Sequence, residues 1–183
     1  MKILLINHYA GSISHGMEYR PYYLAREWIN AGHEVKIVSS SFSHLRIKNP
    51  ELDKSDLLIE TISGVEFTWL AVPHYFGNGI KRIINIFMFI YRLFKYGNSI
   101  ALKFKPDVVI ASSTYPMDIW PASRIAKLSH AKLVFEIHDL WPLTPMELGG
   151  YSAQHPYIML LQSAEDFAYR NSDYVVSILP KVK

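Results

Sequence analysis

Short apolar runs that alternate with longer helical patterns constrain the fold of this chain more than any other feature. Such alternation is typical of βαβ units, in which helical crossovers join parallel strands. We therefore predict an α/β fold, a Rossmann-like doubly wound parallel sheet with strand order 3-2-1-4-5-6. The predicted strands are Ile3–Asn7, Glu34–Ser39, Val65–Ala71, Asp107–Ser112, Lys132–Ile137 and Tyr174–Ile178, and the predicted helices are Tyr19–Ala31, Lys81–Phe104, Asp118–Ser129 and Tyr157–Asn171.

Length and composition narrow the class of protein. The 183 residues are enough for one substantial domain, and 50% of them are apolar, which argues against a disordered chain. Cysteine is absent, so disulfides, thiolate zinc sites and a cysteine nucleophile are all excluded. The apolar run after Met1 is too short for a secretory signal, and we therefore expect a cytoplasmic protein.

Polar and aromatic residues follow several predicted strands directly. The run Leu133–Ile137 leads into His138 and Asp139, which a Trp-Pro turn follows. Parallel strands place their carboxyl ends at one edge, where open α/β sheets bind ligands. Any one of these residues alone is as well explained as core or as a loop cap, but together they predict a rim that binds a substrate. The rim residues at the other strand ends and in the turn are His8, Tyr9, Ser112, Ser113, Tyr115 and Trp141.

A glycine-containing loop lies between the first strand and the first helix. Its glycines, Gly11 and Gly16, allow close approach of the backbone to a ligand, and the following helix N-terminus favours phosphate. The loop lacks the third glycine of a dinucleotide fingerprint and the Lys-Ser/Thr of a P-loop. Arg20, in the first helical turn, could add a guanidinium contact to a bound phosphate. A connection that binds no ligand remains the alternative.

The helix predicted over Lys81–Phe104 is both basic and apolar. The segment from Phe67 to Pro106 holds six basic residues and no acidic one, although the net charge of the whole chain is only +3. Its apolar run is too short to span a bilayer. One interpretation is a buried crossover helix with a basic edge on which Lys81, Asn85, Arg92 and Lys95 share a narrow face.

The other interpretation is contact with an anionic membrane surface. The predicted membrane-contacting residues are Lys81, Arg82, Phe87, Phe89, Arg92 and Lys95. No nucleic-acid partner is expected, because the stripe is too apolar and lacks any recognised motif. The spacing of the eight histidines predicts no metal site, and the chain has no Gly-x-Ser-x-Gly elbow of a serine hydrolase.

Taken in order, several segments resemble the amino-terminal half of a GT-B glycosyltransferase of family 4. The closest resemblance is to members of bacterial surface-polysaccharide biosynthesis that carry a His-Asp-Leu-Trp-Pro segment. The resemblance covers essentially all of the chain. Its segments are Lys2–Asn7 with the loop to Gly16, Tyr22–Glu27, Gly32–Val35, Pro106–Ile110, Phe135–Pro142 and Ser172–Val176.

This resemblance implies a retaining enzyme that moves a sugar from a nucleotide-sugar donor to an acceptor, often a polyprenyl-diphosphate-linked saccharide at the cytoplasmic membrane face. It implies that Gly11, Gly16 and Arg20 lie near the donor diphosphate, and it makes His138 and Asp139 the catalytic candidates. Of these two, His138 would contact the transferred sugar, whereas Asp139 would shape the loop or orient a neighbour. No cofactor besides the donor is implied.

The family's Glu-x7-Glu pair belongs to a carboxyl-terminal donor-binding domain that this chain lacks. We therefore expect residues 1–183 to be the acceptor-side domain of a longer enzyme and to be inactive alone. The abrupt end at Pro180–Lys183 agrees with that expectation. Two other functions remain open, namely a non-catalytic nucleotide- or phosphate-binding module and a domain that binds a protein partner.

Overall fold

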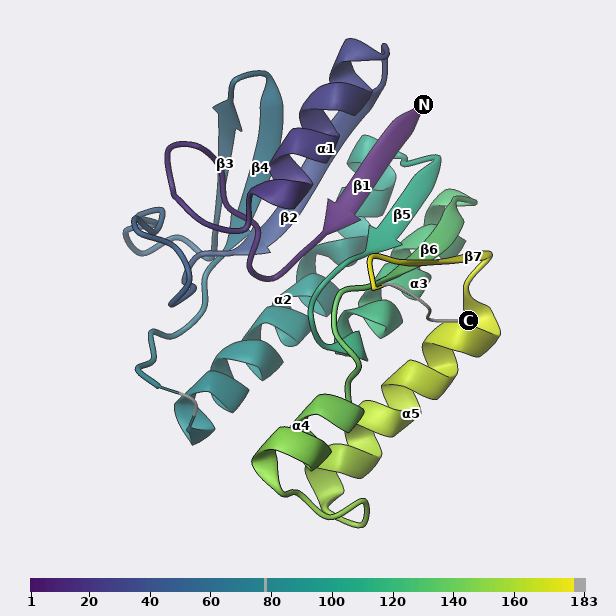
Figure 1. Ribbon diagram of the computed structural model, residues 1–183. Helices are drawn as coiled ribbons and strands as arrows, with labels where there is room; N and C mark the ends of the chain where they lie inside the picture. Colours follow the sequence, from purple (N-terminus) through teal and green to yellow (C-terminus); the bar gives the residue numbers. More distant parts are fainter. Residues whose placement is uncertain (78, 180–183) are drawn as a thin grey trace.

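The computed structural model describes residues 1–77 and 79–179; the Pro180–Lys183 end lies outside them. One seven-stranded sheet has the order β3-β4-β2-β1-β5-β6-β7 (Figure 1). All neighbouring strands are parallel except β3 and β4, which are antiparallel. The strands are β1 (Lys2–Ile6), β2 (Glu34–Ser40), β3 (Leu57–Ile62), β4 (Val65–Leu70), β5 (Val108–Ala111), β6 (Lys132–Ile137) and β7 (Tyr174–Ser177).

Helices cover both faces of this sheet, so the predicted doubly wound fold is confirmed (Figure 1). Helix α1 covers one face, and α2, α3 and α5 cover the other. The six predicted strands have the predicted order, and the antiparallel β3 is added at one edge. The helices are α1 (Tyr19–Asn30), α2 (Ile80–Phe104), α3 (Ile119–Ser129), α4 (Leu143–Gly149) and α5 (Pro156–Asn171), with a 3-10 turn, η1, at Pro116–Asp118.

Strand β1 illustrates why short apolar runs become central strands. Ile3 and Leu5 pack with α1, whereas Leu4 and Ile6 belong to the core on the opposite face. Successive side chains of a strand point to opposite faces, so a strand covered on both sides must be apolar throughout. At the end of α1, Gly32 takes a left-handed conformation with φ +85°, which favours glycine.

The polar segment Ser43–Leu58 is partly integrated into the fold. Its last residues begin β3, which forms a hairpin with β4 through the left-handed pair Ser63–Gly64. Arg46 is buried and donates hydrogen bonds to the carbonyls of His8 and Ala10. Arg46 thus holds the loop after β1 from inside the molecule. The short elements α4 and η1 were not predicted.

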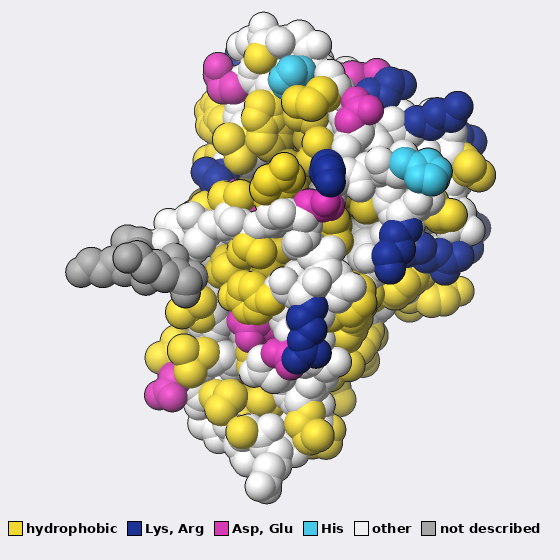
Figure 2. All heavy atoms as spheres, turned by 90° about the vertical axis from the view of Figure 1, so that its right-hand side faces the viewer, with side chains coloured by type: hydrophobic (Ala, Val, Ile, Leu, Met, Phe, Trp, Pro, Cys, Tyr) yellow, Lys and Arg dark blue, Asp and Glu magenta, His cyan; other side chains and the backbone are white. Residues whose placement is uncertain are grey.

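At the edge of the sheet opposite to β3, strand β7 is little covered by the rest of the described chain. Strand β7 is exposed along most of its length, with Tyr174 at 60% and Val176 at 46%. Figure 2 looks at the side of the molecule that holds β7 and α5, and apolar side chains form several patches on it. This edge lies away from the glycine loop and takes no part in the site described next.

Candidate active site

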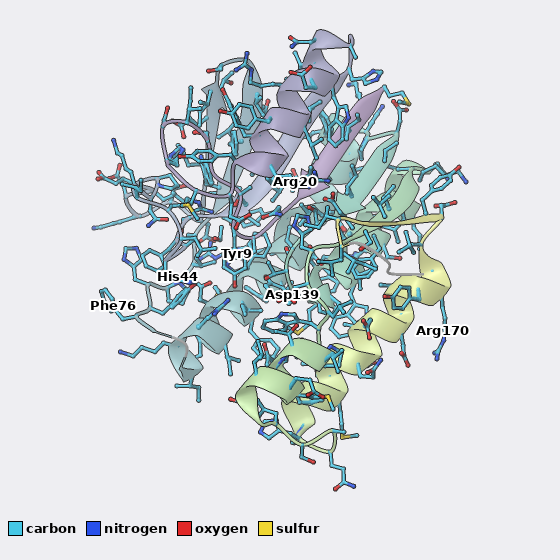
Figure 3. All side chains as sticks on the ribbon, viewed as in Figure 1. Tyr9, Arg20, His44, Phe76, Asp139 and Arg170 are labelled. Carbon is cyan, nitrogen blue, oxygen red and sulfur yellow. The ribbon has the colours of Figure 1, made fainter. Side chains whose placement is uncertain are left out.

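The start of α1, which follows the glycine loop, meets the end of β6 at the carboxyl edge of the sheet. Arg20, in the first turn of α1, donates from Nη2 to Oε1 of Glu136, at 2.5 Å, and Glu136 lies two residues before His138. Figure 3 shows Arg20, Tyr9 and Asp139 around the centre of the molecule, where β1, β5 and β6 end. The predicted convergence of Gly16 and His138 on one edge therefore agrees with the structure.

Glu136, Ser112 and His138 form a compact polar cluster behind this contact. The Ser112 hydroxyl donates to Oε2 of Glu136 at 2.7 Å, and Nε2 of His138 lies 3.0 Å from both of these oxygens. A carboxylate only accepts hydrogen bonds, and the serine proton is already used, so Nε2 must carry a hydrogen. The remaining ring nitrogen, Nδ1, is then an acceptor when the imidazole is neutral.

The negative charge of Glu136 is stabilised by its neighbours although the side chain is buried. Its side chain is 7% exposed, and burial by itself would raise the pKa of the carboxyl group. Hydrogen bonds from His138, Arg20 and Ser112 outweigh burial and lower the pKa of Glu136 to about 2. The carboxylate is therefore ionised at neutral pH, and it orients both Arg20 and His138.

The glycine loop has a strained backbone. Gly16, Met17 and Glu18 are consecutive left-handed residues, with φ of 72°, 44° and 51°. A Cβ added to Gly16 would lie 2.8 Å from Ile47, so this position requires glycine. The Gly16 N–H donates to the carbonyl of Ser12 at 2.9 Å. Left-handed Met and Glu residues are uncommon and are often found at ligand-binding sites.

Gly11 also depends on the absence of a side chain. A Cβ there would lie 2.3 Å from the carbonyl oxygen of Met17, and the Gly11 N–H donates to the carbonyl of Glu18. The two ends of the loop are thus held together before α1 begins. A role of Gly11, Gly16 and Arg20 in phosphate binding stays a prediction.

Asp139 organises the turn after β6. Its Oδ1 accepts from the backbone N–H of Leu140 and the hydroxyl of Thr144, and its Oδ2 accepts from the indole Nε1 of Trp141 at 2.9 Å. Both carboxylate oxygens are therefore engaged within the loop. This arrangement matches the expected loop-shaping role, and it leaves His138 as the catalytic candidate of the pair.

Most of the residues predicted to bind the acceptor are present at this edge but are buried. His8 is 0% exposed; its Nδ1 lies 2.5 Å from the hydroxyl of Tyr115 and its Nε2 lies 2.8 Å from Oδ1 of Asn85. Burial, and then the charge of Arg46, lower the pKa of His8 well below its usual value. Tyr9, Ser112, Ser113 and Tyr115 are buried as well, whereas Trp141 is only partly buried. A role of these residues in acceptor binding stays a prediction.

One buried acidic residue on the same edge was missed. Asp118 is fully buried; its Oδ2 accepts from the backbone N–H of Ser113, and its Oδ1 has no hydrogen-bond partner among the described residues. Burial raises the pKa of Asp118 to about 7. A buried carboxyl group near neutrality is typical of functional sites, although structural networks produce the same shift.

The exposed residues of helix α2 differ from those predicted for its polar and membrane-contacting faces. Asn85 and Phe89 are fully buried, and Phe89 packs against His8 with ring centroids 4.6 Å apart, so neither reaches the surface. Arg92 and Lys95 form ion pairs with Asp56, which lies on the segment before β3. Phe89 therefore does not belong to the exposed face of α2, and the predicted membrane contact stays a prediction. The exposed apolar stripe consists instead of Ile80, Ile84, Phe87, Tyr91 and Phe94.

Across residues 1–77 and 79–179, no group of three or more histidine or acidic side chains is placed to hold a metal ion. Within the same ranges, no helix combines the length and hydropathy needed to cross a membrane.

Glu136 is the main site residue that the sequence reasoning overlooked. It stands between apolar residues of β6 and two positions before His138, on the same side of the strand. An acidic residue inside an otherwise apolar central strand must be paired or neutralised, and that rule could have identified it.

An open α/β sheet with a strained glycine loop and a buried charged cluster at its carboxyl edge defines a Rossmann-like domain. The family of glycosyl transferase 4-like domains matches residues 15–183, and the chain belongs to this family. Its function is therefore of the glycosyltransferase type. The crystal structure of the SurE protein from Aquifex aeolicus matches over 98% of this chain and 67% of its own, with 10% identity and a TM-score of 0.39, a likeness too low to bear on function. No curated protein matches the sequence.

Proposed function

We propose that the chain is the acceptor-side domain of a retaining glycosyltransferase of bacterial surface-polysaccharide biosynthesis. It would work with a carboxyl-terminal donor-binding domain and move a sugar from a nucleotide-sugar donor to a lipid-linked saccharide at the cytoplasmic membrane face. The observation that carries this proposal is the Arg20–Glu136–His138 chain beside the glycine loop, in a domain of this family.

Each part of the cluster has a role in this reaction. Developing charge on the departing diphosphate would be stabilised by the α1 N-terminus and by Arg20. Glu136 fixes His138 through Nε2, so that Nδ1 can accept a hydrogen bond from a hydroxyl of the transferred sugar. Asp139 holds Trp141 and the turn in place. No residue of this chain is assigned as a catalytic base.

Helix α2 offers the surface that would meet the membrane. Its outward stripe runs from Ile80 to Phe94 at helical spacing, and Lys81 and Lys95 flank it. Apolar side chains next to lysines are typical of helices that lie in the interface of an anionic bilayer. Flotation with anionic vesicles tests this contact, and binding that needs no lipid would favour the alternative of a protein partner.

The experiment that tests the proposed function is sugar transfer by the natural enzyme that contains both domains. We expect His138→Ala to lower kcat about 100-fold, because a hydrogen bond near the transferred sugar is lost. The control is His33→Gln, at the opposite edge of the sheet, which should leave the rate unchanged. A normal rate for His138→Ala, or full sugar transfer by the 183-residue chain alone, would contradict the proposal.

A further inference from the structure

Strand β7 is the last strand of the sheet, and among the described residues no strand pairs with its outer edge. Its inner edge pairs with β6 in parallel register, with Val175 beside Phe135. Tyr174, Val175 and Val176 are 60%, 42% and 46% exposed. Figure 2 faces this side of the molecule, where apolar side chains gather in patches. The outer edge of β7 is therefore open to a further strand.

The composition of this edge favours pairing. Proteins commonly protect an open edge with charged side chains or proline, which discourage an added strand. The run from Tyr174 to Ile178 contains neither, and three of its five residues are β-branched. Such residues have a high propensity for strands. The outer edge of β7 thus lacks two common protections and suits a partner strand.

The direction of the backbone amides fixes how a partner strand can pair. The Asp173 N–H donates to the carbonyl of Leu133 in β6, at 2.9 Å. Amide groups alternate in direction along a strand, so those of Tyr174 and Val176 point away from β6. An added strand would therefore form its hydrogen bonds with Tyr174 and Val176.

These two residues complement each other when two identical strands pair antiparallel. A two-fold axis through Val175 sets Tyr174 opposite Val176 of a second copy, and each such pair exchanges both of its backbone hydrogen bonds. An aromatic side chain opposite a β-branched one is a favourable cross-strand pair. Val175 faces its own counterpart on the α5 side of the sheet, because it lies beside Phe135 of that core.

Apolar surface continues from the edge onto α5. Tyr169 is 46% exposed, and its ring meets that of Phe135 edge-on, with centroids 5.9 Å apart. Since Phe135 is also the neighbour of Val175 in β6, Tyr169 and Val175 lie on the same side of the sheet. A second copy would therefore cover apolar side chains as well as backbone groups.

The charges that flank the edge are balanced within one chain. Lys132 pairs with Asp173 at 2.7 Å, and Arg170 pairs with Asp166 at 3.4 Å. A surface without net charge does not repel its own copy, and it offers no attraction to a strongly charged partner. Charge thus favours a second copy over an acidic or basic protein.

From these observations we propose that the outer edge of β7 is an interface between two copies of the chain. The two β7 strands pair antiparallel about an axis through Val175 and join both sheets into one. Such self-complementary contacts with two-fold symmetry are the commonest form of homo-oligomer. The inference does not depend on the proposed function, because this edge lies away from the glycine loop.

A cysteine cross-link tests the register directly, because the chain has no cysteine of its own. Across the axis the two Val175 Cα atoms would be about 4.5 Å apart, within the range of a disulfide. We expect Val175→Cys to give a disulfide-linked dimer on mild oxidation, seen on a non-reducing gel. The control is Ser177→Cys, on the same face but about 14 Å from its counterpart, which should stay monomeric. No cross-link at position 175, or an equal yield at position 177, would overturn the inference.

A charge exchange tests the same interface without a covalent bond. Val175→Lys sets two like charges opposite each other, so we expect dimerisation to weaken at least about tenfold in sedimentation experiments. Mixing Val175→Lys with Val175→Glu should restore the dimer, because opposite charges then meet. The control is Ile59→Lys, at a residue of β3 that is 56% exposed on the other edge strand, and it should dimerise normally. A mixture that stays monomeric would overturn the inference, and circular dichroism checks that each variant is folded.

The natural enzyme distinguishes a second copy from other occupants of the edge. With any cysteine outside these 183 residues replaced by serine, Val175→Cys should cross-link there as well. If another part of the enzyme or a different protein covers β7, the variant stays monomeric and the inference is overturned. Sugar transfer is measured separately, and its presence or absence decides the proposed function alone.

Discussion

His8 and His138 both lie at the carboxyl edge of the sheet, but their surroundings differ. His8, after β1, is sealed in the core, and both of its ring nitrogens have partners from distant segments, Tyr115 and Asn85. His138, after β6, has one nitrogen bound by Glu136 and Ser112. Close to it lies Asp118, a buried carboxyl group whose Oδ1 has no partner among the described residues.

Whether all polar atoms of a histidine have partners distinguishes a structural from a functional role better than the residue type does. A polar network in which every group is paired fixes the positions of the elements and adds stability. A network that leaves a ring nitrogen and a carboxyl oxygen for other partners loses stability and gains the ability to bind. We therefore expect His8 to support the scaffold and His138 to act in the proposed site, although the sequence reasoning placed both in the site.

The largest expected effect concerns Asp118. Because its folded pKa, about 7, lies above the ordinary value of 3.8, its contribution to stability is complete below pH 3.8 and is lost as the pH rises through 7. We expect the free energy of unfolding to fall by about 4 kcal/mol between pH 4 and pH 8 for this reason. Asp118→Asn should remove that fall, as measured by urea unfolding at several pH values. An unchanged pH dependence would show that Asp118 is not held near neutrality.

The comparison of the two imidazoles has a direct test in stability. His8→Ala should lower the free energy of unfolding by about 3 kcal/mol, because it leaves a cavity and two buried groups without partners. His138→Ala should cost about 1 kcal/mol, because Ser112 and Glu136 keep each other. Urea unfolding at pH 7 measures both. Equal losses would remove the distinction between scaffold and site.

A smaller effect is expected from Glu136 in acid. Its folded pKa, about 2, lies below the ordinary value of 4.5, so its contribution is complete above pH 4.5 and is lost as the pH falls towards 2. That loss should be about 2 kcal/mol in the natural protein and absent in Glu136→Gln. The exposed Glu51→Gln serves as the control and should retain the loss. If Glu136→Gln loses as much free energy of unfolding in acid as the natural protein does, the charge of Glu136 does not stabilise the cluster.

Much of the fold could be predicted because its determinants are local. Apolar runs such as Leu133–Ile137 mark strands, and the handedness of the crossovers between them leaves few possible orders. Strand β3 and helix α4 were missed because both are short and carry polar residues that resemble loops. Their positions depend on pairing with β4 and on the turn held by Asp139.

The site was predictable in place but less so in detail. The edge follows from parallel strands, and the positions of Gly16 and His138 follow from that edge. Which face of α2 is exposed does not follow, because Asn85 is drawn inward by His8 and Arg92 is bound by Asp56. A helical wheel cannot show which polar residues find buried partners elsewhere in the chain.

By itself, the sequence determined the kind of sheet, the order of its parallel strands and the edge at which the candidate polar residues lie. It could do so because periodicity and chirality act within short stretches of chain. Only the tertiary structure decided that His8 is buried, that Glu136 binds Nε2 of His138, and that Asn85 of α2 turns inward. Those outcomes depend on partners up to more than a hundred residues apart, and such contacts form only when the chain has folded.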